Sequence, residues 1–267
     1  MVREPAVAGQ FYPGGRESLI KTLDNMILPI KNKVDAICAV VPHAGYSCSG
    51  IVAGEVYAKI MPKETYIILG PNHTGYGSPF SASSESWHTP LANVDVDREL
   101  LDMVMENAPM VKIDPSAHVF EHSIEVQLPF IQRISPEAKI VPITVGYGDL
   151  KDLKKIGDAI SDAADKSGKK IMVLASSDMS HYLPRKTARA KDMMAIEKIL
   201  ALDPEGLLNV VEENDISMCG YIPAVIMLFS ARKMKASGAE LVRYGDSGDL
   251  TGDTGQVVGY AGVIVFK

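Results

Sequence analysis

The chain alternates between short apolar runs and longer stretches in which apolar residues recur every three or four positions. Two of the short runs, 36–41 and 65–69, are rich in β-branched residues and lead into a proline and a glycine, which is typical of buried parallel strands. The segment 51–61 between them is long enough for a crossover helix. We therefore expect the two strands to lie parallel in one sheet.

The same two periods continue to the end of the chain. Further strands are predicted at 138–145, 170–175, 241–244 and 256–265, and helices at 17–27, 98–107, 150–167, 186–201, 203–211 and 221–234. Residues 78–97 indicate an edge hairpin or excursion, and a helix is expected to begin at Glu121, with Pro129 kinking or ending its first segment. This alternation predicts a three-layer α/β/α fold around a central mixed, mostly parallel sheet.

Composition narrows the class of protein. With 267 residues, 46% hydrophobic and 22% charged, and with no low-complexity linker, we expect a single domain over 1–267. A net charge of −6 and the lack of a Lys/Arg cluster argue against a nucleic-acid partner. Neither a signal-peptide core nor a membrane-length apolar run is present. Three cysteines without framework spacing predict reduced thiols in a cytoplasmic protein.

Metal-ligating residue types follow the predicted strands where each strand ends. His43 and His73 follow the first two strands, Asp178 and His181 follow a later one, and Cys219 precedes an apolar helix. Open α/β sheets bind ligands at this edge, and imidazole, carboxylate and thiolate are ligands of divalent transition metals. One histidine beside Pro and Gly is more often a turn residue. Three histidines that follow three predicted strand ends favour a shared metal site.

Three groups of candidate residues also have ordinary explanations. Cys219 ahead of an apolar helix would usually be a small buried hydrophobe, although a helix N-terminus would lower its pKa and favour the thiolate. Glu121, His122 and Glu125 share one side of a turn, which fits a solvent-facing position and a place near a site equally well. For the aromatic pair in the N-terminal segment, packing on the body is favoured over a pocket wall.

Several familiar motifs are excluded. The segment 45–50 is no nucleophile elbow, because Ser49 stands where the second glycine is required. Residues 246–253 lack both the order of a calcium loop and its closing glutamate. No Walker loop or dinucleotide fingerprint is present, so phosphate-binding functions of these kinds are not expected.

A set of motifs spread over the whole chain resembles the MEMO family. They are Ala8-Gly-x-Phe-Tyr-Pro13, Pro42-His-Ala-Gly-Tyr-x-x-Ser-Gly50, Gly70-Pro-Asn-His73, Trp87-x-Thr-Pro-Leu91, Glu121-His-Ser-x-Glu-x-Gln-Leu-Pro129, Ser177-Asp-x-Ser-His181, Cys219-Gly220 and Gly259-Tyr-Ala. The resemblance implies a fold similar to that of the class III (LigB-type) extradiol dioxygenases. In those enzymes two histidines and a glutamate hold non-haem Fe(II), and another histidine works as acid/base.

Carried over to this sequence, the resemblance implies that His43 and His73 bind the metal and that His181, with Asp178 beside it, is the acid/base. Cys219 stands where the dioxygenases have the carboxylate. A thiolate there softens the site toward copper, zinc or another Fe(II) environment, and the incomplete facial triad argues against ring cleavage. We expect a divalent transition metal, iron or copper before zinc, and redox activity on an unidentified substrate.

Two alternatives stay open at the same residues. One is a non-catalytic module in which aromatic side chains contact a peptide or partner protein and the histidines hold an anionic group. The other is hydrolysis by a zinc-bound water. The resemblance further implies phosphotyrosine-peptide binding in eukaryotic members, and radical-SAM and AMMECR-type partners in microbial ones. We assign the substrate pocket to Phe11, Tyr12, Tyr46, Trp87, His122 and Glu125.

Overall fold

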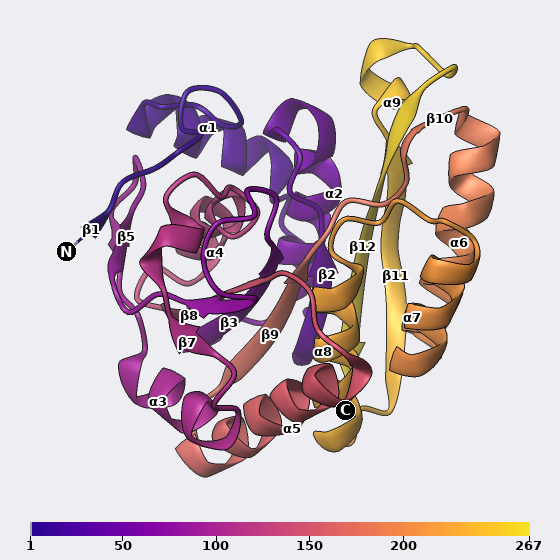
Figure 1. The fold of residues 1–267 in the computed structure, drawn as a ribbon. Coiled ribbons are helices and arrows are strands. Elements are labelled where there is room, and N and C mark those ends of the chain that lie inside the picture. Colours follow the sequence, from indigo (N-terminus) through magenta and orange to yellow (C-terminus); the bar gives the residue numbers. More distant parts are fainter. Residues whose placement is uncertain (1) are drawn as a thin grey trace.

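The main sheet of the molecule is mixed and has helices on both faces (Figure 1). The structure is a computed structural model and describes residues 2–267. Eight strands follow one another across the sheet in the order β10 (His181–Leu183), β12 (Val257–Phe266), β2 (Ala36–Val41), β9 (Ile171–Ser176), β3 (Thr65–Pro71), β8 (Lys139–Val145), β4 (Phe80–Ala82) and β7 (Lys112–Ile113). A ninth, β11 (Gly238–Asp246), also pairs with β12.

The centre of the sheet is parallel, and its flanks make it mixed. Strands β2, β9, β3 and β8 all run in one direction, whereas β12 is antiparallel to β2 and β4 is antiparallel to β8. Every residue of β3 and β9 is buried, which explains their continuous apolar runs. Strands β2 and β3, the first two strands predicted from the sequence, are therefore parallel in one sheet, as expected, with β9 between them.

Helices cover the two faces of this sheet. Helix α8 packs on β2, β3 and β9 and against α5, while α2 packs on β11 and β12 with α1 and α4 beside it. No helix within residues 2–267 has the length and apolar character needed to cross a bilayer. The helices are α1 (Arg16–Met26), α2 (Tyr46–Lys59), α3 (Arg98–Asn107), α4 (Leu128–Ile134), α5 (Leu150–Ser167), α6 (Arg185–Leu200), α7 (Pro204–Glu213), α8 (Tyr221–Lys233) and the short α9 (Gly248–Thr251).

Local sequence signals explain the starts of three helices. Aspartate side chains cap α3, α5 and α7 by accepting a backbone N–H from the first turn, and Pro204 takes the first position of α7. Helix α2 begins at Tyr46, earlier than the predicted crossover helix.

The helix predicted from Glu121 is absent there. A 3₁₀ turn, η2 (Glu125–Gln127), leads into α4 instead, and Pro129 lies in the first turn of α4 rather than at a kink. The reason is local, because the Glu121 carboxylate accepts the backbone N–H groups of His122 and Ser123. A side chain that binds its own neighbouring backbone competes with helix formation.

The segment 78–97 is the excursion that its pattern indicated. Its first strand, β4, joins the edge of the main sheet and pairs with β7, which precedes the 3₁₀ helix η1 (Pro115–His118). The next two strands, β5 (Ser86–His88) and β6 (Asn93–Val94), form a small hairpin that pairs with β1 (Val2–Arg3). The start of the chain is thereby fixed against this excursion.

Two glycines permit close approach of the segments that lie at the carboxyl ends of β3 and β9. A Cβ atom at Gly70 would overlap the side chain of Ser123, and one at Gly220 would overlap the backbone of Ser176. Glycine at these positions lets the turn that begins at Glu121 lie against the end of β3, and the segment before α8 against the end of β9.

Candidate metal centre

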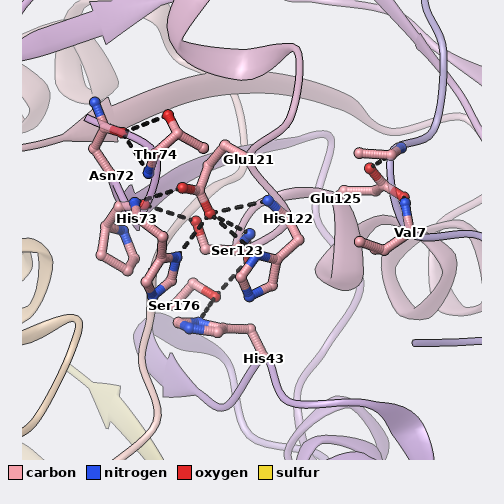
Figure 2. A network of polar contacts seen from close by, with 12 residues as sticks. Val7, His43, Asn72, His73, Thr74, Glu121, His122, Ser123, Glu125 and Ser176 are labelled. Atoms are coloured by element: carbon pink, nitrogen blue, oxygen red, sulfur yellow. Dashed lines mark hydrogen bonds and ion pairs between the residues drawn. The ribbon is translucent and has the colours of Figure 1, made fainter. Parts of the chain in front are cut away.

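Three imidazoles meet at the carboxyl edge of the parallel strands. His43 follows β2, His73 follows β3, and His122 lies in the turn before η2 (Figure 2). Their potential ligand atoms all lie within 4.8 Å of one another, and their ring centroids are 4.7–5.5 Å apart. Imidazole nitrogens that converge from separate elements form a donor set suited to a transition metal. The cluster of His43, His73 and His122, called here the histidine cluster, could therefore bind a metal.

The histidine cluster is closed on one side and open on the other. The ring of His43 is buried, while the side chains of His73 and His122 are 34% and 22% exposed. Phe11, from the N-terminal segment, lies with its ring centroid 4.8 Å from that of His122. A metal held by the three rings would have protein behind it and solvent in front of it.

A buried carboxylate orients the ring of His73 and holds the backbone of His122. Figure 2 shows Glu121 between His73 and His122. Its Oε1 lies 2.9 Å from Nδ1 of His73 and accepts the backbone N–H groups of His122 and Ser123 at 2.9 Å, and its Oε2 accepts the N–H of His73 at 2.6 Å. With Nδ1 bound to the carboxylate, His73 presents Nε2 as its free donor atom. Such outer partners fix both the tautomer and the orientation of a ligating imidazole.

The ionisation of these groups suits metal binding. Burial alone would raise the pKa of Glu121, but the hydrogen bonds and the charge of His73 lower it to about 2, so the carboxylate is anionic. Burial lowers the pKa of His122 and takes that of His43 well below its usual value. Burial acts the same way on His73, but Glu121 outweighs it, and the pKa of His73 is raised. Two rings are thus neutral and ready to donate a lone pair near pH 7.

Glu121→Gln is expected to weaken metal binding by roughly 10–100-fold, the cost of losing an outer-shell partner. An amide cannot offer two anionic oxygens to the four N–H groups that converge on Glu121. Competition against a chromophoric chelator measures the affinity for Zn(II) and Co(II). Glu64→Gln is the matched control, since Glu64 also accepts a backbone N–H but belongs to the opposite edge of the sheet. Equal affinities in both variants would contradict the role of Glu121.

Cys219 and Asp178 both contact His43. The Cys219 Sγ is 3.3 Å from Nε2 of His43 and accepts the N–H of Asp178. The Asp178 carboxylate accepts the N–H of His43 at 2.9 Å and that of Ala44 at 3.3 Å. Cys219 therefore contacts one member of the histidine cluster but is not part of the group whose ligand atoms are all mutually close. Whether it also binds the metal stays a prediction.

The pKa of the Cys219 thiol is shifted opposite to the expected direction. Burial is the larger cause and the negative charge of Asp178 the second, and both raise the pKa. The position of Cys219 just before α8 was expected to lower it. Loss of solvation outweighs the partial positive charge of one helix end, so the thiol keeps its proton unless a metal displaces it.

His181 lies at the start of β10, beside the histidine cluster rather than in it. Its Nδ1 is 2.8 Å from the carbonyl oxygen of Ser217, and its backbone N–H binds the Ser217 hydroxyl. Its Nε2 is thus available for proton exchange. The pKa of Asp178 is raised, mainly by burial, and the nearby His181 works in the opposite direction. The acid/base role of His181 and Asp178 remains a prediction.

Glu125, assigned to the substrate pocket from the sequence, instead anchors the N-terminal segment. Its carboxylate is fully buried and forms an ion pair with Arg3. It also accepts the N–H groups of Ala6 at 2.7 Å and Val7 at 3.1 Å, and the hydroxyl of Tyr12 at 2.6 Å. With all its acceptor positions engaged inside the protein, Glu125 has none left for a ligand.

Three of the four aromatic residues assigned to the pocket are also interior residues. Tyr12, Tyr46 and Trp87 are each at most 3% exposed, because they fill the space between the N-terminal segment, α2 and the β5 hairpin. Of the six predicted pocket residues, the structure brings Phe11 and His122 to the histidine cluster. Glu121, which the sequence placed on the same turn without a role, orients the ring of His73 and holds the backbone of His122.

Comparison with known proteins gives one consistent result. A family model described as Memo-like protein matches residues 3–264. A MEMO1 family protein of Methanosarcina barkeri is 44% identical, covering 99% of this chain and 100% of its own. MEMO1 family proteins of Archaeoglobus fulgidus and Aquifex aeolicus are 43% and 42% identical, with 98% of this chain and 99% and 98% of their own covered.

Among solved structures, the uncharacterized protein JW3007 of Escherichia coli K12 has a similar fold. The TM-score is 0.56 at 13% sequence identity, and the match covers 87% of this chain and 100% of that chain. At this identity the likeness supports the fold alone.

Proposed function

This chain belongs to the Memo-like protein family, and on that premise we propose that it binds a divalent transition metal at the histidine cluster and uses it in redox chemistry. The observation that carries the proposal is the convergence of three imidazoles from three separate loops. An outer carboxylate that fixes the ring orientation supports it, because such partners accompany ligating histidines.

The residues present fit a late first-row metal. Imidazole ligands suit iron, copper, nickel and zinc, and a neighbouring thiol shifts the preference toward soft ions. We propose His43, His73 and His122 as ligands, with the Cys219 thiol, 3.3 Å from Nε2 of His43, as a fourth donor. Iron or copper is proposed before zinc, because the redox proposal requires a metal that changes oxidation state.

The side chains around the histidine cluster could admit a ligand and exchange a proton with it. A bound iron or copper ion would supply electron transfer to a substrate or to O₂. On the protein side, the exposed faces of His73 and His122 admit a ligand from solvent. His181, with Nε2 unengaged, would exchange a proton with that ligand, and Asp178 would hold the loop of His43 through two backbone N–H groups.

The proposal is tested by metal analysis of protein purified without oxygen. We expect iron or copper to be retained near stoichiometry and to cycle between two oxidation states when reductant and O₂ are added in turn. Failure to bind any of Fe(II), copper and Zn(II) on reconstitution would sink the metal proposal. Binding of zinc alone, with hydrolytic activity, would select the hydrolytic alternative over redox chemistry.

A second candidate function, recognition of a partner protein, is supported by a set of exposed aromatic residues. Among the described residues, the aromatic side chains that are exposed are Tyr76 (59%), Phe120 (67%), Tyr147 (81%) and Tyr182 (71%). Three of them lie within three residues of His73, His122 or His181, and Tyr147 follows the end of β8. Tyr182 also has a φ of +58°, which is strained for a side chain of this size.

These four residues, called here the aromatic rim, replace the buried aromatics first considered as partner contacts. Exposed aromatic side chains on separate loops offer large contact area at low conformational cost. A protein partner, such as a radical-SAM or AMMECR-type protein, would then sit over the histidine cluster. Substituting all four rim residues by serine is expected to abolish such binding and to spare the metal, whereas serine at Leu28 and Ile30, exposed elsewhere, should change neither.

A further inference from the structure

The third ring of the histidine cluster, His43, is not bound to Glu121 but to a different set of buried residues. Its Nδ1 lies 2.9 Å from the hydroxyl oxygen of Ser176 (Figure 2). Ser176 is the last residue of β9 and is fully buried. The same hydroxyl is 2.7 Å from the carbonyl oxygen of Ser123 and 2.9 Å from the side-chain nitrogen of Gln127.

The three partners of the Ser176 hydroxyl fix the direction of each hydrogen bond. A serine hydroxyl has one proton to donate and two lone pairs to accept with. The Ser123 carbonyl oxygen can only accept, so the hydroxyl of Ser176 donates its one hydrogen bond to that oxygen. The remaining two contacts, from Gln127 and from His43, must then be donated to Ser176. Nδ1 of His43 therefore carries a proton, and Nε2 carries the lone pair.

The positions of the nitrogen and oxygen of the Gln127 side-chain amide are fixed by its hydrogen bonds to Pro42 and Tyr57. Its amide nitrogen lies 2.9 Å from the carbonyl oxygen of Pro42, which can only accept, and its amide oxygen accepts the hydroxyl of Tyr57 at 2.8 Å. The buried Tyr57 keeps its proton, since burial raises its pKa well above the usual value. A flipped amide would place its oxygen against the carbonyl oxygen of Pro42, so that two acceptors would face each other.

We propose that Tyr57, Gln127 and Ser176 form a directional hydrogen-bond chain that holds His43 in the Nδ1–H tautomer and so makes Nε2 its metal-binding atom. These three are positioning residues, acting on the metal through His43. The part of this inference that concerns metal affinity rests on the proposed function, while the tautomer is a property of the protein without metal.

The hydrogen-bond chain also joins His43 to the other residues around the histidine cluster. The Ser123 carbonyl that receives the Ser176 proton belongs to the turn whose backbone is held by Glu121. Nε2 of His43 points toward the Cys219 Sγ at 3.3 Å. One serine hydroxyl thus sets the ring of His43 and ties it to the turn that carries His122.

The tautomer is read directly by long-range ¹H–¹⁵N NMR of imidazole-labelled, metal-free protein. In the wild type we expect the His43 signals of an Nδ1–H ring. Ser176→Ala removes the acceptor that holds this proton, so a population with the proton on Nε2 should appear. Ser176→Thr, which keeps the hydroxyl, should restore the wild-type pattern. An Nε2–H ring in the wild type, or an unchanged pattern in Ser176→Ala, would overturn the proposal.

Ser230→Ala is the matched control for loss of a buried hydroxyl. Ser230 is also fully buried, and its hydroxyl donates to a backbone carbonyl, that of Gly157, at 2.7 Å. This variant should lose stability as Ser176→Ala does and leave the His43 signals unchanged. Should Ser176→Ala fail to fold, Gln127→Met is the second variant. It frees one lone pair of Ser176 and leaves Pro42 without its donor, and heterogeneous His43 signals are expected.

Metal affinity gives an independent test of the hydrogen-bond chain formed by Tyr57, Gln127 and Ser176. Chelator competition with Zn(II) and Co(II) should show a loss of roughly 10–100-fold in Ser176→Ala and no loss in Ser230→Ala. Absence of metal binding in the wild type would refute the proposed function while leaving the tautomer result intact. Metal bound equally well by wild type and Ser176→Ala would overturn the positioning role and leave the proposed function standing.

Discussion

His43→Ala is expected to abolish stoichiometric metal binding, with a larger loss than the roughly 100-fold upper range for an outer-shell partner. His43 is the ring that contacts both the other two imidazoles and the Cys219 thiol. Its removal therefore disables a three-histidine site and a site that includes Cys219 alike. Metal content after dialysis against a chelator measures the effect, and a thermal melt checks that the fold is kept.

The control for this variant is another histidine outside the cluster. His88 lies in the β5 hairpin with Nδ1 bound to the side chain of Asn93, and His88→Ala should bind metal as the wild type does. Retention of metal by His43→Ala would refute the site.

The third ligand is identified by comparing His122→Ala with Cys219→Ala. We expect the larger loss in His122→Ala, because the pKa of the Cys219 thiol is raised and its deprotonation opposes binding near neutral pH. The reverse order would make Cys219 the third ligand, as the resemblance to the dioxygenase site implies.

Arg3→Met is expected to lower the free energy of unfolding by roughly 3–5 kcal/mol, the usual cost of breaking a buried ion pair. The variant leaves the fully buried Glu125 carboxylate without its cation. It also removes donors to the carbonyl oxygens of His118 and Glu121 and the guanidinium that stacks over Trp87. At this chain length the melting temperature should fall by roughly 6–20 °C.

An exposed ion pair gives the matched control for Arg3. Arg133 pairs with Asp24, and both side chains are 46% exposed, so Arg133→Met should change stability by less than about 1 kcal/mol. Equal destabilisation by the two variants would mean that the buried pair has no special role. Replacing Arg3 and Glu125 together by methionine should recover part of the loss, because no unpaired charge then remains inside.

The parallel direction of β2 and β3 and two of the clustered histidines were predictable from local pattern. His43 and His73 each follow an apolar, β-branched run, and strands of that kind end at one edge of a parallel sheet. The family resemblance rested on the same short motifs, and the comparisons confirm it. Short-range signals of this kind depend on residues that are neighbours in the sequence.

The contacts that were missed join residues far apart in the sequence. Nothing near Glu125 indicates that its partner is Arg3, 122 positions earlier, so a polar residue on a turn was read as part of a pocket. Tyr12, Tyr46 and Trp87 are buried by packing that involves the same N-terminal segment. The residues next to them in the sequence do not indicate this burial, so local pattern alone predicts that they contact a ligand. For Cys219, helix position was visible in the sequence, but the degree of burial that raises its pKa was not.

The long separation between Arg3 and Glu125 has a consequence for the order in which the protein folds. Closing a loop of this length is entropically costly before its contacts form, and contacts of high sequence separation slow folding. The pairing of β2 with β9 joins residues that are at least as far apart, such as Cys38 and Val173, so the sheet carries the same kind of cost. The turn that presents His122 needs one more step, because Arg3 must also dock to bind Glu125 and the carbonyl oxygen of Glu121. A refolding protein should thus regain its secondary structure before it regains the capacity to capture an ion.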